Sequence, residues 1–236
     1  MMQNRHLFPI SLIQALLPDR FTRLVLLFRL SLFWLVISGF SVNATSLYVA
    51  GPDVPEPVQI VESRTKLLMD ELSNRKAEFD TDPKKLIYFA RNVALGSWNL
   101  KKTSRLILGS NWYQADVTQQ QRFEEEFLRT LMRYVVKAYG FYDDSLVEIL
   151  SYDWQAQGSG GWVRSVVRLP AGLKVSVDYR MDLDDDKHWK MVDVRVEGIS
   201  LVSSKRTEYR DEIRQNGLEA LIKAMADKNQ RVLTNN

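Results

Sequence analysis

Apolar residues recur at helical spacing through the first part of the chain, between residues 58 and 139. Leu68 and Leu72 belong to one such stripe among charged positions, and Leu86 and Ala90 belong to the next. Spacings of three and four residues place side chains on one face of a helix, so they predict amphipathic helices. The predicted helices cover residues 58–79, 83–96, 101–108 and 118–139. Three prolines lie in residues 51–57, and we expect residues 45–57 to form a lead-in loop.

The pattern predicts the helix over residues 118–139 most clearly. Thr118 is placed to cap its first turn, with Gln121 three residues later in the capping-box position, and the acidic residues 124–126 suit the early turns of a helix. Its apolar stripe comprises Phe123, Phe127, Leu131, Tyr134, Val135, Ala138 and Tyr139. This helix is therefore expected to bury an aromatic-rich face.

After Gly140 the period of the apolar positions changes from 3.6 to 2, which indicates strands. Strands are predicted over residues 146–155, 162–169 and 173–181, and a fourth follows with Val192, Val194 and Val196 on one face. Asp178 and Asp193 fall on the opposite face, which the alternation predicts to be solvated. Short turns between the strands favour an antiparallel meander.

Helical spacing returns after residue 203 and predicts two more helices, over residues 206–216 and 218–226, followed by a frayed polar end. We therefore expect an α+β fold, a curved four-stranded antiparallel meander flanked by about six helices. Residues 58–229 are expected to form a single domain, and residues 230–236 a polar tail.

The excess positive charge lies at the start of the chain. The formal charge is +3, and the first 44 residues hold four Arg and one Asp, which leaves 28 basic and 28 acidic residues in the remainder. An apolar run over residues 30–40 follows Arg29, and small residues precede a possible cut after Ala44. This layout is typical of a secretory signal, so residues 1–44 are expected to be removed. An uncleaved anchor over residues 24–42 is the alternative, although it would place Arg29 within the membrane.

Neither nucleic-acid binding nor catalysis is indicated by the exported part. Its net charge is zero and its basic pairs are short, so it lacks the basic patch that a polyanion requires. Cysteine is absent, and His188, beside the acidic residues 184–186, is the one histidine after the leader. We interpret this segment as a solvated hairpin, because the spacing of a calcium loop is missing. No catalytic residue and no metal site are predicted.

The chain resembles the MlaC family, also called the toluene-tolerance or organic-solvent-tolerance proteins. The likeness rests on residues 108–112, Ala115, Thr118, 120–123, Phe127, Leu131, Tyr142, 177–179, 189–202, Arg206, Tyr209, 212–214, 216–222 and 228–229, in this order along the chain. One departure is Asn99-Leu100, where many members have Asp-Phe.

The resemblance implies a helix-flanked sheet around an apolar cavity for acyl chains. Members are periplasmic phospholipid carriers that work between an outer-membrane lipoprotein–porin complex and an inner-membrane ABC transporter bearing an MCE-domain ring. Phospholipid would be the ligand, and no cofactor is implied. The matching cavity walls would comprise Phe127, Leu131, Tyr134, Val135, Ala138, Val175, Val177, Tyr179, Val194, Val196, Ile199 and Leu201.

Two other classes of protein stay open. An enzyme on a similar cone-like α+β scaffold would need Asp178 or Asp193 to point into the cavity, whereas strand alternation directs both away from it. A membrane-tethered adaptor domain would use the same aromatic residues only to fill a core.

Overall fold

A computed structural model of the protein describes residues 54–139, 148–157, 160–168 and 174–233. The predicted leader, most of the lead-in loop, Tyr142, residues 146–147 and the end of the tail lie outside these ranges. Within the described part, no helix combines the length and apolar character needed to cross a membrane.

Eight helices occur in the described ranges. They are α3 (Glu56–Asn74), α4 (Lys76–Thr81), α5 (Pro83–Ser97), α6 (Leu100–Leu108), α7 (Ser110–Gln114), α8 (Val117–Tyr139), α9 (Leu201–Asn216) and α10 (Leu218–Leu233). Five of these depart from the sequence prediction. The helix expected over residues 58–79 is divided into α3 and α4, α7 was not predicted, α9 begins five residues early, and α10 continues through much of the expected polar tail.

The predicted cap of α8 is wrong. Asp116, rather than Thr118, caps the helix: its Oδ1 atom accepts a hydrogen bond from Gln119 N at 2.8 Å, and Asp116 N donates to Gln119 Oε1 at 3.3 Å. This reciprocal pair is a capping box two residues before the predicted one. Both positions carry suitable residue types, and Asp116 lies at the point where the chain enters the helix.

The sheet has five antiparallel strands instead of four. It comprises β1 (Glu148–Gln157), β2 (Gly160–Arg168), β3 (Lys174–Leu183), β4 (Trp189–Val196) and β5 (Ile199–Ser200), ordered as they occur in the chain. The fifth strand exists because Glu197 and Gly198, with φ angles of 51° and 78°, turn the chain back on itself. Val196 then pairs with Ile199.

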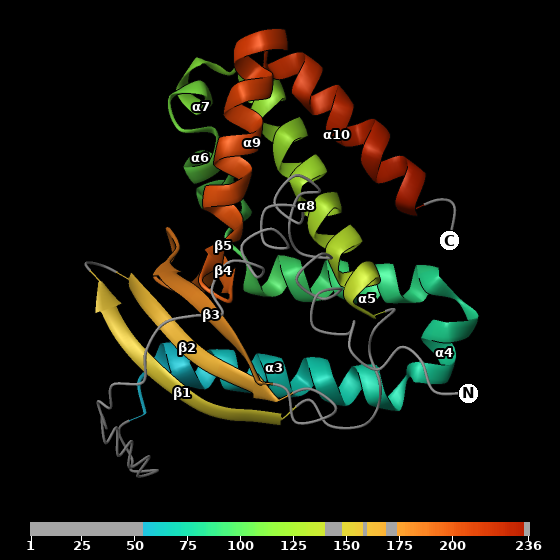
Figure 1. The fold of residues 1–236 in the computed structure, drawn as a ribbon, viewed down its shortest axis with the longest axis vertical. Helices are drawn as coiled ribbons and strands as arrows, with labels where there is room; N and C mark the ends of the chain where they lie inside the picture. Colours follow the sequence, from blue (N-terminus) through green and yellow to red (C-terminus); the bar gives the residue numbers. More distant parts are fainter. Residues whose placement is uncertain (1–53, 140–147, 158–159, 169–173, 234–236) are drawn as a thin grey trace, which may run out of the picture.

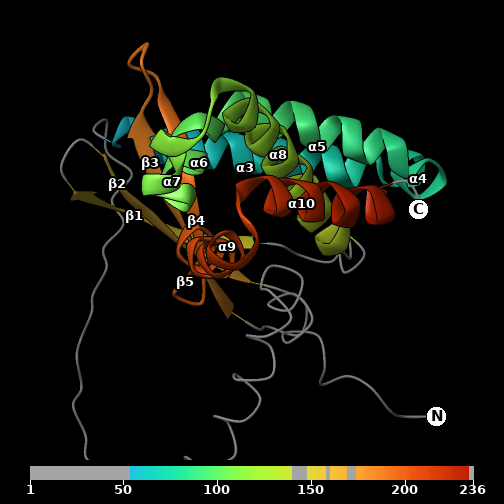
Figure 2. The same ribbon diagram turned by 90° about the horizontal axis from the view of Figure 1, so that it is seen from above.

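The sheet and a helical bundle lie at two ends of the molecule (Figure 1), with α3 running along the sheet and α5 and α8 extending away from it. Seen from above, α9 stands almost end-on beside β4 and β5 (Figure 2). Helices α6, α8, α9 and α10 contact one another. The largest core cluster lies among them, and Phe123, Phe127 and Ile222 are its most buried members.

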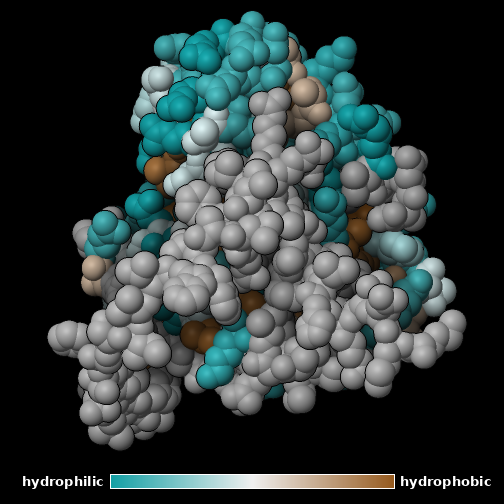
Figure 3. All heavy atoms as spheres, in the orientation of Figure 1, coloured by the Kyte–Doolittle hydropathy of each residue, from teal (hydrophilic) through white to brown (hydrophobic). Residues whose placement is uncertain are grey.

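A smaller core joins α3, α4, α5 and α8 around Leu72, Phe79 and Leu86. Described atoms over the upper helices are largely hydrophilic on the face shown in Figure 3, and brown apolar atoms show mainly lower on that face. On this face, the described surface of the upper helices is therefore mostly polar.

Asp193 is buried, which corrects the prediction that its side of β4 is solvated. Only 3% of the residue is exposed, because the start of α9 packs beside β4. The carboxylate accepts hydrogen bonds from Ser200 Oγ (2.6 Å), Val202 N (3.0 Å) and its neighbour Val194 N (2.8 Å). Burial raises the pKa of Asp193, although these hydrogen bonds act to lower it. A carboxylate at the N-terminus of a helix also suits the helix dipole, so Asp193 holds α9 against the sheet.

Replacing Asp193 by Ala is expected to lower the free energy of unfolding by about 2 kcal/mol, because the buried Val202 N–H loses a charged acceptor. Chemical denaturation measures this loss. Asp185→Ala, at an exposed position, is the control and is expected to change stability by less than about 0.5 kcal/mol. Equal losses in the two variants would contradict the role assigned to Asp193.

Arg75 marks the break between α3 and α4. Its guanidinium carbon lies 4.7 Å from the ring centroid of Phe79, and its Nε donates to Glu78 Oε2 at 2.7 Å. Lys85 Nζ lies 3.1 Å from the other oxygen of Glu78. Hydrogen bonds from Arg75 and Lys85 lower the pKa of Glu78 to about 2.

Arg75→Gln is expected to raise the pKa of Glu78 toward its ordinary range, which an NMR titration of the Glu78 side chain would detect. Because the folded-state pKa is depressed, this pair stabilises the fold above the ordinary pKa of Glu78 and is lost as the pH falls toward 2. Lys66→Gln is the control. It removes an exposed ion pair between Lys66 and Asp70 of α3 and should leave the pKa of Glu78 unchanged. A Glu78 pKa that is the same in the Arg75 variant and the native protein would refute the assignment.

Candidate functional site

Strand register brings the predicted wall residues of the sheet to one face. Val177 is directly opposite Val196, and Tyr179 is directly opposite Val194, so these four side chains project on the same side. Val175 lies two residues from Val177 and shares this face. The same register adds Val163 of β2, which is opposite Tyr179 and fully buried. Sequence alternation identified this face for Val177, Tyr179, Val194 and Val196 but did not identify Val163 as part of it. The expected place of Val192 on this face is wrong, because a register shift puts Met191 opposite Met181.

Helix α3 covers the part of this face near the β3–β4 hairpin. Val58 and Val61 of α3 pack against Val163 and Met181, and Trp154, Trp189 and Met191 surround them. Tyr179 belongs to the same cluster, and burial raises the pKa of its hydroxyl, opposed by a side-chain hydrogen bond with Thr65 of α3. This end of the apolar face is therefore closed by packed side chains.

The predicted wall residues of α8 lie in or beside the bundle core. Phe127 is completely buried and stacks on Phe123, with ring centroids 6.4 Å apart. Leu131 and Tyr134 are 7% and 8% exposed and belong to the same cluster, which also contains Leu201 and contacts Val194. Leu201 is the first residue of α9 and does not extend a strand. The side chain of Ala138 lies outside the described residues.

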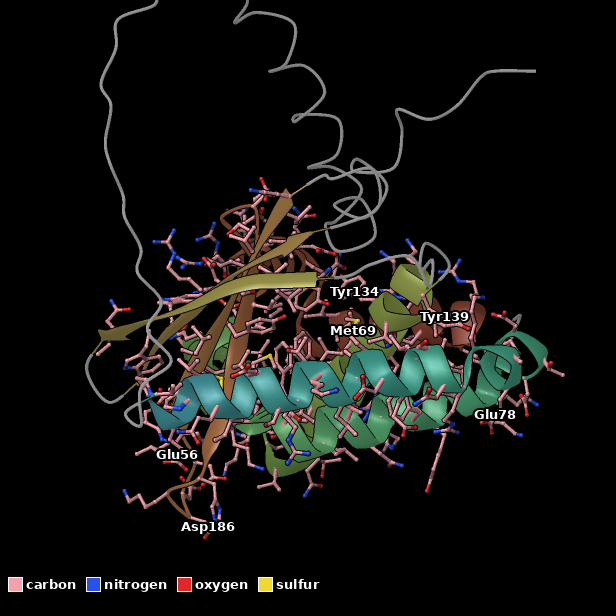
Figure 4. All side chains as sticks on the ribbon, turned by 90° about the horizontal axis from the view of Figure 1, so that it is seen from below. Glu56, Met69, Glu78, Tyr134, Tyr139 and Asp186 are labelled. Atoms are coloured by element: carbon pink, nitrogen blue, oxygen red, sulfur yellow. The ribbon has the colours of Figure 1, made fainter. Side chains whose placement is uncertain are left out.

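Several apolar residues of the sheet and of α8 remain partly exposed. Val135, Val177, Tyr179, Val194 and Ile199 are half-buried, whereas Val175 and Val196 are buried. Figure 4 shows Met69 on the side of α3 toward the sheet, and Tyr134 in the part of the view between β1 and α8. Met69 is also half-buried and was missed by the sequence analysis, since it lies beside the stripe of Leu68 and Leu72.

Asp178 lies on the opposite face of the sheet and is buried there, which again corrects the expected solvation. It is 4% exposed and accepts a hydrogen bond from Arg195 Nη2 at 2.8 Å. The guanidinium of Arg195 lies 3.6 Å from the ring centroid of Trp162. Asp178 is therefore engaged by an arginine on the side away from Val177, and Asp193 is engaged by α9. Neither carboxylate faces the apolar side of the sheet.

The β3–β4 hairpin brings Asp184, Asp186 and His188 close together. Their possible ligand atoms lie within 4.8 Å of one another, and Asp186 and His188 are exposed. Asp184 Oδ1 accepts hydrogen bonds from Asp186 N (3.0 Å) and His188 N (2.8 Å), and these two hydrogen bonds lower the pKa of Asp184, that from His188 more strongly. The carboxylate thus closes the turn through hydrogen bonds to the backbone.

The fold and the site together define a helix-covered antiparallel α+β domain whose sheet directs one apolar face toward helices α3 and α8. The chain belongs to the MlaC family, since the family model described as MlaC protein matches residues 62–227. This finding confirms the resemblance identified from the sequence.

A solved structure from Ralstonia solanacearum has a similar fold. It is described as the phospholipid-binding protein in complex with a phospholipid, and the two structures agree with a TM-score of 0.66 at 20% sequence identity. The match covers 75% of this chain and 98% of the other. At this identity the likeness concerns the fold. No curated protein sequence matches the chain.

Met181→Ala is expected to lower the free energy of unfolding by about 2–4 kcal/mol, because it leaves a cavity beneath α3 at a position that is 1% exposed. Chemical denaturation gives the loss, and hydrogen exchange should show faster exchange of the α3 amides. Met69→Ala, the same substitution at a half-buried position of α3, should cost distinctly less. The opposite ranking of the two variants would show that α3 is not held by the Met181 contact.

Proposed function

We propose that the protein is a periplasmic carrier that binds the acyl chains of a phospholipid between the apolar face of its sheet and helices α3 and α8. Membership of the MlaC family is the observation that carries this proposal. The phospholipid in the structure from Ralstonia solanacearum, which shares the fold, supports it. The partly exposed residues Val135, Val177 and Val194 are the proposed contacts for the lipid, together with Met69.

The energetics of transfer suit such a carrier. Two chains of 16 carbons hold about 30 methylene and methyl groups, so moving them into water would cost on the order of 20 kcal/mol at ~0.8 kcal/mol per group. Release into the aqueous phase would therefore be negligible. Exchange with a membrane or with the apolar site of a partner would be nearly balanced, so the carrier needs docking and no covalent step.

The proposed partners are an inner-membrane ABC transporter with an MCE-domain ring and an outer-membrane lipoprotein–porin complex. The role would be to maintain the lipid asymmetry of the outer membrane, which also underlies solvent tolerance. Binding rather than catalysis is supported by the engagement of Asp178 with Arg195 and of Asp193 with α9, because both candidate acids already have partners outside the apolar side. Export would follow from the leader over residues 1–44.

Native mass spectrometry of the gently purified, exported protein should detect a bound diacyl phospholipid. Val177→Trp is expected to reduce the fraction of lipid-bound protein several-fold, because an indole would occupy space next to Val196 on the proposed wall. Val117→Trp is the matched control, since Val117 is 68% exposed on α8. Circular dichroism verifies that both variants fold.

Persistent absence of lipid from the native protein would overturn the proposed function. Equal lipid occupancy in the Val177 variant and the native protein would instead refute the assignment of this face as the wall.

A further inference from the structure

Two basic side chains are buried near the ring of Tyr134. Arg133 of α8 is 5% exposed and Lys205 of α9 is 2% exposed. The guanidinium carbon of Arg133 lies 5.6 Å from the ring centroid of Tyr134, and Lys205 Nζ lies 5.7 Å from the same centroid. Lys205 Nζ is also 5.3 Å from the ring centroid of Tyr209. Two cations from different helices therefore share one aromatic side chain.

Among the described residues, one carboxylate partners one of these two cations. Glu208 Oε2 accepts a hydrogen bond from Lys205 Nζ at 2.7 Å. Arg133 forms no ion pair or hydrogen bond with the described residues, and its Nε atom is buried without an acceptor. The cluster of Arg133, Lys205 and Glu208 therefore carries a formal charge of +1.

Lys205 keeps its charge despite its burial. Burial alone acts to lower the pKa of Lys205, but interactions with Tyr209, Tyr134 and Glu208 outweigh it and raise the pKa above its ordinary value. Burial raises the pKa of the Tyr209 hydroxyl, so this group stays neutral near pH 7. Neither Lys205 nor Tyr209 therefore releases its proton near pH 7, and the positive charge of the cluster remains.

A buried charge without a counter-ion is unfavourable, so the cluster suits an anion of single charge. Guanidinium groups bind phosphate oxygens in a two-point geometry, and a lysine ammonium adds a point charge. Hydrogen bonds to a charged phosphate are stronger than cation–π contacts of this length, so a phosphate could displace the ring face of Tyr134 as the partner of both cations. A phosphodiester carries the single negative charge that balances the cluster.

We infer that Arg133 and Lys205 bind a phosphate group, and that its source is the headgroup of the bound phospholipid. This inference rests on the proposed function for the source of the phosphate. Tyr134 links the phosphate site to the proposed acyl-chain site, since it contacts both cations and was also predicted to be a wall residue for the acyl chains. Inorganic phosphate has the same recognisable chemistry, and the experiment separates the two sources.

The test offers lipid-free protein to vesicles of dioleoylphosphatidylcholine that also contain dioleoylglycerol, which has the same chains and no phosphate. The ratio of the two lipids recovered with the protein is compared with their ratio in the vesicles. Arg133→Gln is expected to lower the preference for the phospholipid about tenfold. Arg122→Gln is the control, since Arg122 lies on the same helix in an exposed ion pair with Glu219, and it should leave the ratio unchanged.

A second measurement compares thermal unfolding of the lipid-free native protein in sodium phosphate and in sodium chloride of equal ionic strength. It needs no variant, so it remains informative if Arg133→Gln does not fold, and Lys205→Gln then replaces that variant in the lipid test. Stabilisation by phosphate that the variant loses, with an unchanged lipid ratio, would assign the site to free phosphate and overturn the headgroup as its source. An unchanged lipid ratio without any effect of phosphate would overturn the site itself.

These outcomes are distinct from failure of the proposed function. If the native protein recovers neither lipid, the carrier proposal fails, and the phosphate measurement still tests Arg133 and Lys205. If it recovers both lipids equally, the carrier proposal holds and the headgroup assignment fails.

Discussion

The apolar face of the five-stranded sheet must be removed from water, and the other elements are arranged around that requirement. The strands form a simple meander, and the described residues from β1 to β4 include no helix, so the helical cover comes from before and after the sheet in the chain. Helix α3 supplies it from before, through Val58 and Val61 against Met181 and Val163. Toward the other end of the face, Val194 contacts the bundle core that contains Leu201. A cover made from two separate groups of helices leaves residues such as Val177 only half-buried between them.

The polar side of the same sheet is used to attach the bundle. Asp193 receives the first turn of α9, Thr103 of α6 donates to the carbonyl oxygen of Val192 at 2.9 Å, and Lys102 Nζ lies 2.6 Å from Asp182 Oδ2. These contacts place α6 and α9 beside β4 and fix the bundle to this strand. Apolar covering and polar attachment thus use different groups of one strand, and an apolar ligand against Val177 would leave the polar contacts of Asp193 in place.

Periodicity predicted the elements that are long enough to show it, and missed features that depend on neighbours in space. Helix α8 and strand β3 were predicted almost as they occur, because their apolar positions repeat several times. Strand β5 has two residues and therefore no period, and its pairing depends on the turn at Glu197 and Gly198. Alternation placed Asp178 and Asp193 on the correct face, but it carries no information about what covers that face. Val163 and Met69 were not predicted to lie near the apolar face, because a partner across the sheet or beside a helix is set by register and docking.

The burial of Arg133 could not be predicted from the sequence and follows from the packing of the helices. An arginine in the middle of a helix is normally solvated, and nothing in the residues around Arg133 distinguishes it from Arg129, which is exposed and paired with Glu125. Packing α9 beside α8 brings Lys205 to the same tyrosine and removes both cations from water. A carrier for a neutral apolar molecule would gain nothing from such a pair, since hydrophobic residues of similar size would pack without the cost of buried charge. The cluster suits a ligand that is apolar over most of its length and carries a phosphate group near one end, as a phospholipid does.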